Sequence, residues 1–106
     1  MKHWRLFIES TTFTKYIGNY LTDDQYKDLQ EYLLEHPKAG DIIPKSGGVR
    51  KVRWGLGNKG KSGGIRVIYY LPSGNIIWFL TVYAKGEVST IPGPTLKKIK
   101  EAMKNE

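Results

Sequence analysis

The sequence contains no cysteine and only two histidines. Without cysteine, neither a disulfide framework nor a thiolate metal site can form. The histidines, His3 and His36, lie far apart in the chain, and neither has Cys, Asp or Glu residues at the spacing of a zinc site. We therefore expect a protein that binds no metal ion.

Long hydrophobic runs are also missing. The longest apolar run, residues 76–80, is far shorter than the roughly 20 residues that span a bilayer. Residues 1–9 mix charged and apolar side chains, unlike a signal peptide. The chain has 106 residues, 40% hydrophobic and 25% charged, which is typical of one globular domain. These features predict a single cytoplasmic domain over residues 1–106.

Acidic residues are scarce in the second part of the chain. Residues 1–44 contain five Lys or Arg and seven Asp or Glu, whereas residues 45–106 contain twelve and three. Seven of the basic residues fall between Lys45 and Arg66, with no acid among them. Such a concentrated cationic field attracts polyanions, nucleic acids above all. The alternative is that these side chains only keep a surface loop solvated.

The first part of the chain predicts a strand followed by two helices. Apolar residues alternate over residues 4–9, which indicates the strand. The first helix begins at Ser10 or Thr11, and its expected core face consists of Phe13, Tyr16, Ile17 and Tyr20. The second helix begins at Thr22, which forms a capping box with Gln25, and it ends before Pro37.

The remainder predicts a loop, three strands and a helix. Residues 38–48 have the composition of a loop, and residues 49–54, 65–71 and 76–83 are rich in β-branched and aromatic residues. A last helix begins at about Thr95, with its lysines 97, 98, 100 and 104 expected on the solvated side. The predicted fold is α+β, with element order β-α-α-β-β-β-α and a mostly antiparallel four-stranded sheet. We expect the two N-terminal helices and the C-terminal helix to cover one face and leave the other face free for function.

Gly55, Gly60, Lys61 and Ser62 match the phosphate-loop pattern of nucleotide hydrolases. That loop works because a helix follows it at once and directs its amides at the phosphates, whereas the residues that follow here, 65–71, indicate a strand. We therefore interpret residues 55–64 as a basic hairpin tip. Its Lys59 and Lys61 are candidates for contacts with phosphate, and an ordinary long turn is the alternative.

The strand at residues 49–54 carries candidates for chemistry. Side chains alternate along a strand, so Lys51 and Arg53 share one face while Val52 and Trp54 share the other. Arg66 opens the next strand, and a hairpin can bring it close to both cations. Converging cations suit the cleavage of RNA by its own 2′-hydroxyl, which needs charge stabilisation at phosphate and proton transfer. The alternative is an electrostatic binding surface without catalysis.

The order of elements and several segments together resemble the RelE superfamily of toxins, within which the HigB type is most similar. The segments are Gly-Val-Arg-Lys-Val-Arg at 48–53, Lys-Gly-Lys-Ser-Gly-Gly-Ile-Arg-Val-Ile-Tyr-Tyr at 59–70, Pro-Lys-Ala-Gly-Asp at 37–41 and Thr-Val-Tyr-Ala-Lys-Gly-Glu at 81–87. The resemblance implies a RelE-like fold and a ribosome-dependent mRNA endonuclease that arrests translation without a metal or organic cofactor. It also implies a HigA-like helix-turn-helix antitoxin as partner, with operator DNA bound only through that antitoxin.

The resemblance also suggests roles for individual residues. Arg53 and Arg66 match cations that bind phosphate and stabilise the transition state, and Lys51 matches a residue for proton transfer or positioning. Lys85 stands where relatives often have an arginine, and the C-terminal tyrosine that serves some members as a base has no counterpart, so Tyr83 or Tyr70 would replace it. The candidate catalytic residues are therefore Lys51, Arg53, Arg66 and Lys85, and the candidate RNA-binding residues are Arg50, Lys59, Lys61, Tyr70 and Tyr83.

Two other classes of function remain open. A noncatalytic module that binds RNA or the ribosome would need the same charge but no group that acts on the transition state. A structural protein that binds an acidic partner would show no dependence on RNA at all.

Overall fold

The computed structural model describes residues 6–55, 64–87 and 91–104, which form one α+β domain. Its elements in chain order are β1 (Leu6–Glu9), α1 (Thr11–Ile17), α2 (Asp23–Glu35), β2 (Asp41–Ile42), β3 (Arg50–Trp54), β4 (Ile65–Ser73), β5 (Ile76–Ala84) and α3 (Gly93–Lys104). The α+β class and the order of the predicted elements are confirmed. The sheet has five strands rather than four, because β2 forms within the segment predicted to be a loop.

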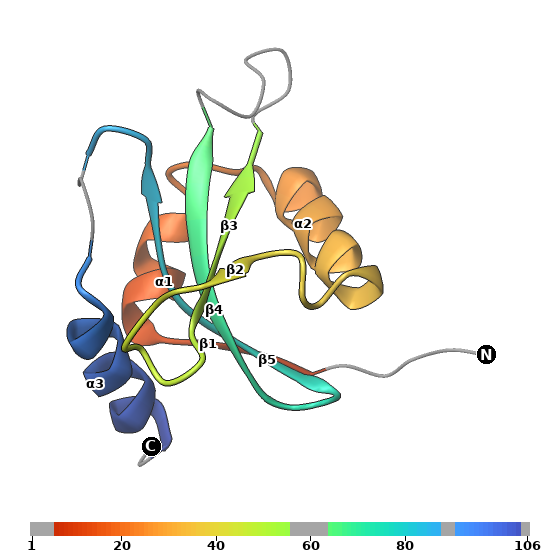
Figure 1. The fold of residues 1–106 in the computed structure, drawn as a ribbon. Helices are drawn as coiled ribbons and strands as arrows, with labels where there is room; N and C mark the ends of the chain where they lie inside the picture. The colour runs from red at the N-terminus through yellow and green to blue at the C-terminus, as the bar shows by residue number, and fades with distance from the viewer. Residues whose placement is uncertain (1–5, 56–63, 88–90, 105–106) are drawn as a thin grey trace.

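The five strands form a mixed, mostly antiparallel sheet in the order β1-β5-β4-β3-β2 (Figure 1). The strands β2 to β5 pair antiparallel, whereas β1 pairs parallel to β5 at one edge. The other edge is β2, which has only two residues and pairs with Arg50 and Lys51. The edge of β3 beyond Lys51 therefore has no neighbouring strand among the described residues.

Local capping explains where the first two helices begin. Ser10 accepts a hydrogen bond from the backbone N–H of Phe13 and donates one to the carbonyl of Leu80, so it caps α1 and ties it to β5. Thr22 and Gln25 form the predicted capping box of α2. The expected core face of α1 is only partly right, because the helix ends at Ile17 and leaves the side chain of Tyr16 40% exposed.

One face of the sheet packs against α1 and α2. The buried residues of this layer are Phe13, Ile17, Leu21, Leu29 and Leu33 from the helical part and Val52, Ile65, Val67, Tyr69, Ile77, Phe79 and Val82 from the strands. The rings of Phe7, Phe13 and Phe79 stack at its centre, with centroid distances of 5.6 and 4.6 Å to Phe79. Val52 and Trp54 belong to this layer, as the alternation along β3 predicts.

The helix α3 packs on the opposite face, so the prediction that all helices share one face is wrong. Leu96 and Met103 of α3 form a second buried cluster with Ile68 and Leu80 of the sheet. The apolar stripe of α3 has to be buried, and α1 and α2 already occupy the first face. The second face is therefore partly covered rather than free.

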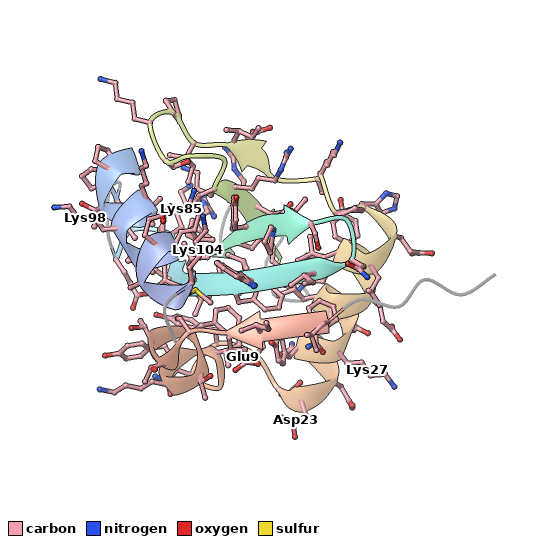
Figure 2. The ribbon with its side chains drawn as sticks, turned by 90° about the horizontal axis from the view of Figure 1, so that it is seen from below. Glu9, Asp23, Lys27, Lys85, Lys98 and Lys104 are labelled. Carbon is pink, nitrogen blue, oxygen red and sulfur yellow. The ribbon has the colours of Figure 1, made fainter. Side chains whose placement is uncertain are left out.

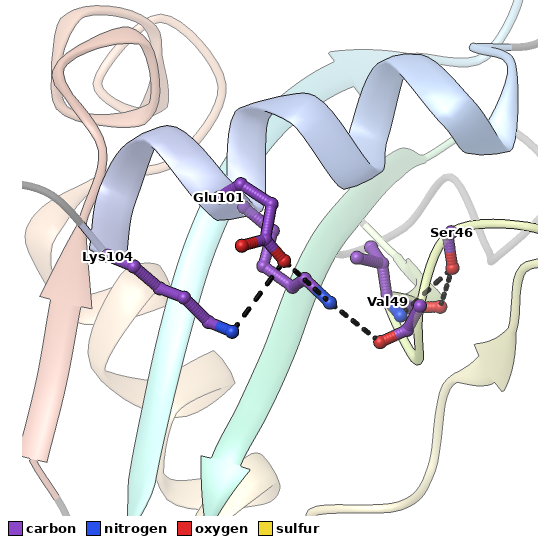
Figure 3. A network of polar contacts seen from close by, with 6 residues as sticks. Ser46, Val49, Glu101 and Lys104 are labelled. Atoms are coloured by element: carbon purple, nitrogen blue, oxygen red, sulfur yellow. Dashed lines mark hydrogen bonds and ion pairs between the residues drawn. The ribbon is translucent and has the colours of Figure 1, made fainter.

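Lys100 anchors α3 to the turn between β2 and β3 (Figure 3). Its ammonium group donates to the carbonyl of Gly47 at 2.9 Å, lies 4.5 Å from the ring centre of Tyr70 and pairs with Glu101 at 3.6 Å. Lys100 is only 4% exposed, so its expected place on the solvated side is wrong. The lysine contacts combine a charge-assisted hydrogen bond with a cation–π contact, which offsets the cost of burying the charge.

Charge is distributed unevenly over the surface. Figure 2 shows Lys85, Lys98 and Lys104 at the upper left of the view and Glu9 and Asp23 along the bottom, where Lys27 also lies. The acidic first part of the chain supplies β1 with Glu9 and α2 with Asp23, and the basic part supplies β3, β4 and α3. A polyanion is thus attracted to a particular side of the domain.

The residues after Gly64 form β4, not a helix, which removes the helix N-terminus that a phosphate loop requires. A Cβ atom at Gly64 would lie 2.0 Å from the carbonyl oxygen of Trp54, so this position needs glycine for close packing against β3. Most of the candidate phosphate-loop motif, residues 56–63, lies outside the described residues. Within the described part of the chain, no helix has both the length and the apolar character needed to cross a membrane.

Candidate nucleic-acid interface

Three neighbouring strands bring Arg53, Arg66 and Tyr83 into one row across the sheet. Arg53 of β3 lies directly opposite Arg66 of β4, which lies directly opposite Tyr83 of β5. Directly opposite residues point to the same face, with their Cβ atoms about 4.5–5.5 Å apart. The structure therefore confirms the predicted convergence of Arg53 and Arg66. We call the two arginines together with the uncharged Tyr83 the cationic row.

Lys51 joins the cationic row from the same face. It lies two residues before Arg53 on β3 and opposite Ile68, which places it diagonally from Arg66. Diagonal neighbours have Cα atoms about 7–8 Å apart, within reach of long side chains. Lys51, Arg53 and Arg66 thus lie on one face of the sheet as close neighbours.

The cationic row lies on the face that α3 partly covers. The buried cluster under α3 includes Ile68 and Tyr83, so the helix borders the row. It does not seal the cations, because Arg53 is exposed and Lys51 and Arg66 are half-buried. In Figure 1, α3 lies at the lower left, whereas β3 ends at the top of the view. The cations remain accessible at the end of the sheet away from α3.

One nitrogen of Arg66 lacks a partner. Its Nη1 atom is buried and makes no hydrogen bond within the described part of the chain. A buried polar group without a partner costs about 1–3 kcal/mol, and more when the group is charged. Native proteins retain such groups rarely, and often for a functional reason. An anionic oxygen would provide the missing acceptor once neighbouring side chains move aside to expose this nitrogen.

Tyr83 is a proton donor rather than a base at neutral pH. Burial raises the pKa of its phenol above the usual value, and the positive charge of Arg66 opposes part of that rise. The phenol therefore keeps its proton in the physiological range. The side chain is 9% exposed, so access to the hydroxyl is limited in this conformation.

Lys85 follows β5 and is exposed. Its backbone N–H donates to the carbonyl of Gly64 at 3.2 Å, which holds it beside the start of β4 and two residues beyond Tyr83. The carboxylate of Glu87 accepts from the N–H of Ala84 at 2.7 Å and from the hydroxyl of Tyr20. These bonds fix the chain around Lys85, at the border of the cationic row.

Two candidate RNA-binding residues lie away from the cationic row. The guanidinium of Arg50 donates to the carbonyls of Gly40 at 2.7 Å and Lys38 at 3.4 Å, so part of it supports the loop after α2. Tyr70 packs beneath Lys100 of α3. Contact of either residue with RNA remains a prediction. Lys59 and Lys61 lie outside the described residues.

Sequence reasoning missed a groove between the end of α2 and the edge of β3. One hollow of about 440 Å³ is lined by Tyr32, His36, Pro37, Lys38 and Ala39. A second hollow of about 410 Å³ is lined by Tyr32, Ala39, Asp41, Lys51, Val52 and Arg53. The two hollows share Tyr32 and Ala39, and together we call them the α2–β3 groove. Its existence depends on β2, which the sequence pattern did not indicate.

The described residues contain no group of three or more His, Asp or Glu side chains that could hold a metal ion. A search of the sequence against models of known protein families finds no match.

Proposed function

We propose that this chain is an endoribonuclease that cuts messenger RNA in the decoding site of the ribosome, and thus a toxin of a toxin–antitoxin pair. The observation that carries the proposal is the cationic row, in which Arg66 faces Arg53 and has a buried nitrogen without a partner among the described residues. A scissile phosphate would supply negative oxygens to both guanidinium groups. The half-buried position of Arg66 strengthens that interaction, because the local dielectric is lower than in water.

The chemistry uses the 2′-hydroxyl of RNA as nucleophile. Its oxygen bonds to the neighbouring phosphorus while the bond to the 5′-oxygen breaks, which gives a 2′,3′-cyclic phosphate and a free 5′-hydroxyl. Arg53 and Arg66 stabilise the charge that develops on the phosphate oxygens. Lys51 positions the 2′-hydroxyl or, as the neutral amine, takes its proton and becomes ammonium, and Tyr83, which holds its own proton at neutral pH, donates that proton to the leaving oxygen. No metal ion is needed in this scheme, because RNA itself supplies the nucleophile.

The choice of messenger RNA and ribosome as targets rests on the resemblance to the RelE superfamily. The same resemblance supports a helix-turn-helix antitoxin as the partner that neutralises the chain. The fold is consistent with this proposal, since the observed order of the predicted helices and strands is the expected one with the addition of β2.

A second candidate function is binding to RNA or the ribosome without cleavage. The burial of Tyr83 favours this candidate, because a hydroxyl that is hard to reach is a poor proton donor to a bound substrate. Both candidates use the same cations, so affinity for RNA alone does not separate them. Analysis of the RNA products separates them, because only the first candidate cuts the message.

The test compares Arg66→Ala with Lys98→Ala, a control that removes an exposed lysine from α3. Wild type should arrest growth and leave messages cut within codons on ribosomes. Arg66→Ala should lower the rate of cleavage about 10²–10³-fold, as is typical when one group that stabilises a developing oxyanion is lost. Lys98→Ala should cleave like wild type.

The same variants test whether Arg66 is kept for function. Removing the half-buried Arg66 should leave thermal stability unchanged or raise it, because its buried Nη1 atom has no hydrogen-bond partner to lose among the described residues. Loss of activity together with loss of the fold would argue that Arg66 is structural. Tight binding to messages that stay uncut would favour the noncatalytic candidate. Wild type that neither binds RNA nor affects growth would refute both.

A further inference from the structure

The α2–β3 groove combines flat aromatic surface with positive charge. The ring of Tyr32 lies 5.0 Å from that of His36 and 5.3 Å from that of Trp54, in tilted contacts. Tyr32 is half-buried and lines both hollows, and His36 is exposed. Aromatic faces of this kind stack with nucleobases, which present a π-face whatever their sequence.

Charge is placed on both sides of these rings. Lys38 lines the hollow that contains His36, and Lys51 and Arg53 line the other. Asp41 is the only carboxylate among the described residues that line the groove. A phosphate is attracted to Lys51 and Arg53 and repelled by Asp41, so a polyanion bound here has a defined orientation.

The loop that lines the groove is fixed before any ligand arrives. The hydroxyl of Tyr69 donates to the carbonyl of Pro37 at 2.7 Å and accepts from the N–H of Gly40 at 2.9 Å. Arg50 donates to the carbonyl of Gly40 from the other side. A site held by such contacts loses little conformational freedom when it binds, which favours affinity.

We propose that the α2–β3 groove binds one unstacked nucleotide of an RNA strand. Its base lies against Tyr32 and His36, and its phosphate contacts Lys51 and Arg53. This inference rests on the proposed function, because Arg53 belongs both to the groove and to the cationic row. The groove would then hold a nucleotide that neighbours the scissile phosphate. An acidic peptide would use the cations but would have no need of the aromatic rings.

The experiment measures binding of short single-stranded RNAs that differ in one position, where the nucleotide either keeps its base or is abasic. Abasic RNA retains every phosphate, so it isolates the contribution of the base. The variants are His36→Ala and Tyr32→Leu, and Tyr16→Leu serves as the matched control because Tyr16 is an exposed tyrosine on α1. His36→Ala alters an exposed side chain and should not affect folding.

Wild type and Tyr16→Leu should bind the RNA with the base about 5-fold to 100-fold more tightly than abasic RNA at one position, which is the usual effect of a stacked base. His36→Ala and Tyr32→Leu should lose most of this preference and still bind abasic RNA like wild type. Equal binding of both RNAs by wild type would overturn the groove proposal and leave the proposed function intact. An acidic peptide that competes as well as RNA of equal charge would also overturn it. Absence of any binding or cleavage of RNA by wild type would instead refute the proposed function.

Discussion

Substitution of Tyr69 by phenylalanine tests how the loop after α2 is held. Tyr69 is fully buried, and its hydroxyl bonds both the carbonyl of Pro37 and the N–H of Gly40. The substitution removes only that oxygen. Gly40 is buried, so its unpaired N–H should cost about 1–3 kcal/mol, while the partly buried carbonyl of Pro37 should lose about 1 kcal/mol. We expect the free energy of unfolding to fall by about 2–4 kcal/mol in total.

The measurement is urea unfolding followed by circular dichroism, with Tyr16→Phe as the control. Tyr16 is exposed, so loss of its hydroxyl should change stability by less than about 0.5 kcal/mol. The slope of free energy against urea should stay the same for both variants, because the buried surface hardly changes. A loss below about 1 kcal/mol for Tyr69→Phe would refute the reasoning, since it would mean that the loop does not depend on these two bonds.

Three further perturbations have outcomes fixed by single contacts. Gly40→Ala places a Cβ atom 2.9 Å from backbone atoms of β3, so it should displace the loop, destabilise the domain in urea and weaken binding of a stacked base. Lys100→Met should lower stability by about 1–3 kcal/mol in thermal unfolding, because it removes the donor to Gly47, and an unchanged melting temperature would contradict that role. Burial and a hydrogen bond to Glu87 raise the pKa of Tyr20 to about 12. The stability that this hydroxyl contributes should therefore persist below pH 10 and be lost as the pH rises toward 12, and the absorbance of tyrosinate measures the titration.

Elements with local signals were predictable from the sequence. The capping box of Thr22 and the serine cap at Ser10 depend on residues within three positions, so the starts of α1 and α2 could be placed correctly. The proline after α2 marked its end in the same way, one residue beyond the C-cap at His36. Such features are determined by neighbours in the chain, and the tertiary fold does not override them.

Features that depend on distant contacts were not predictable. The strand β2 has two residues, too few for any periodic pattern, and exists because Asp41 and Ile42 meet the edge of β3. β5 has one extra residue, Leu80, between Phe79 and Thr81, which pair with Tyr69 and Ile68 of β4, so the alternation along β5 changes at this bulge. The assignment of all helices to one face failed because β4 and β5 place apolar side chains on both faces, so their pattern does not indicate which face α3 covers.

The candidate site likewise combines features that the sequence predicted with features that it did not. The shared face of Lys51 and Arg53 follows from alternation along one strand, and the structure confirms it. The pairing of Arg53 with Arg66 depends on the register of a hairpin, which the sequence leaves open. The groove around Tyr32 was missed entirely, because it needs α2, β2 and β3 in place at once.

The parallel pairing of β1 with β5 has a consequence for how the chain acquires its fold. Ser10 bonds to Leu80, 70 positions later, and β1 has no other strand to pair with among the described residues. Contacts between residues this far apart in the sequence form late in folding, because a long stretch of chain must be ordered first. During synthesis β1 must therefore wait for β5 to leave the ribosome before the two strands can pair. A nascent chain that ends before β5 would lack the strand that pairs with β1 and the bond from Ser10 to Leu80 that ties α1 to the sheet.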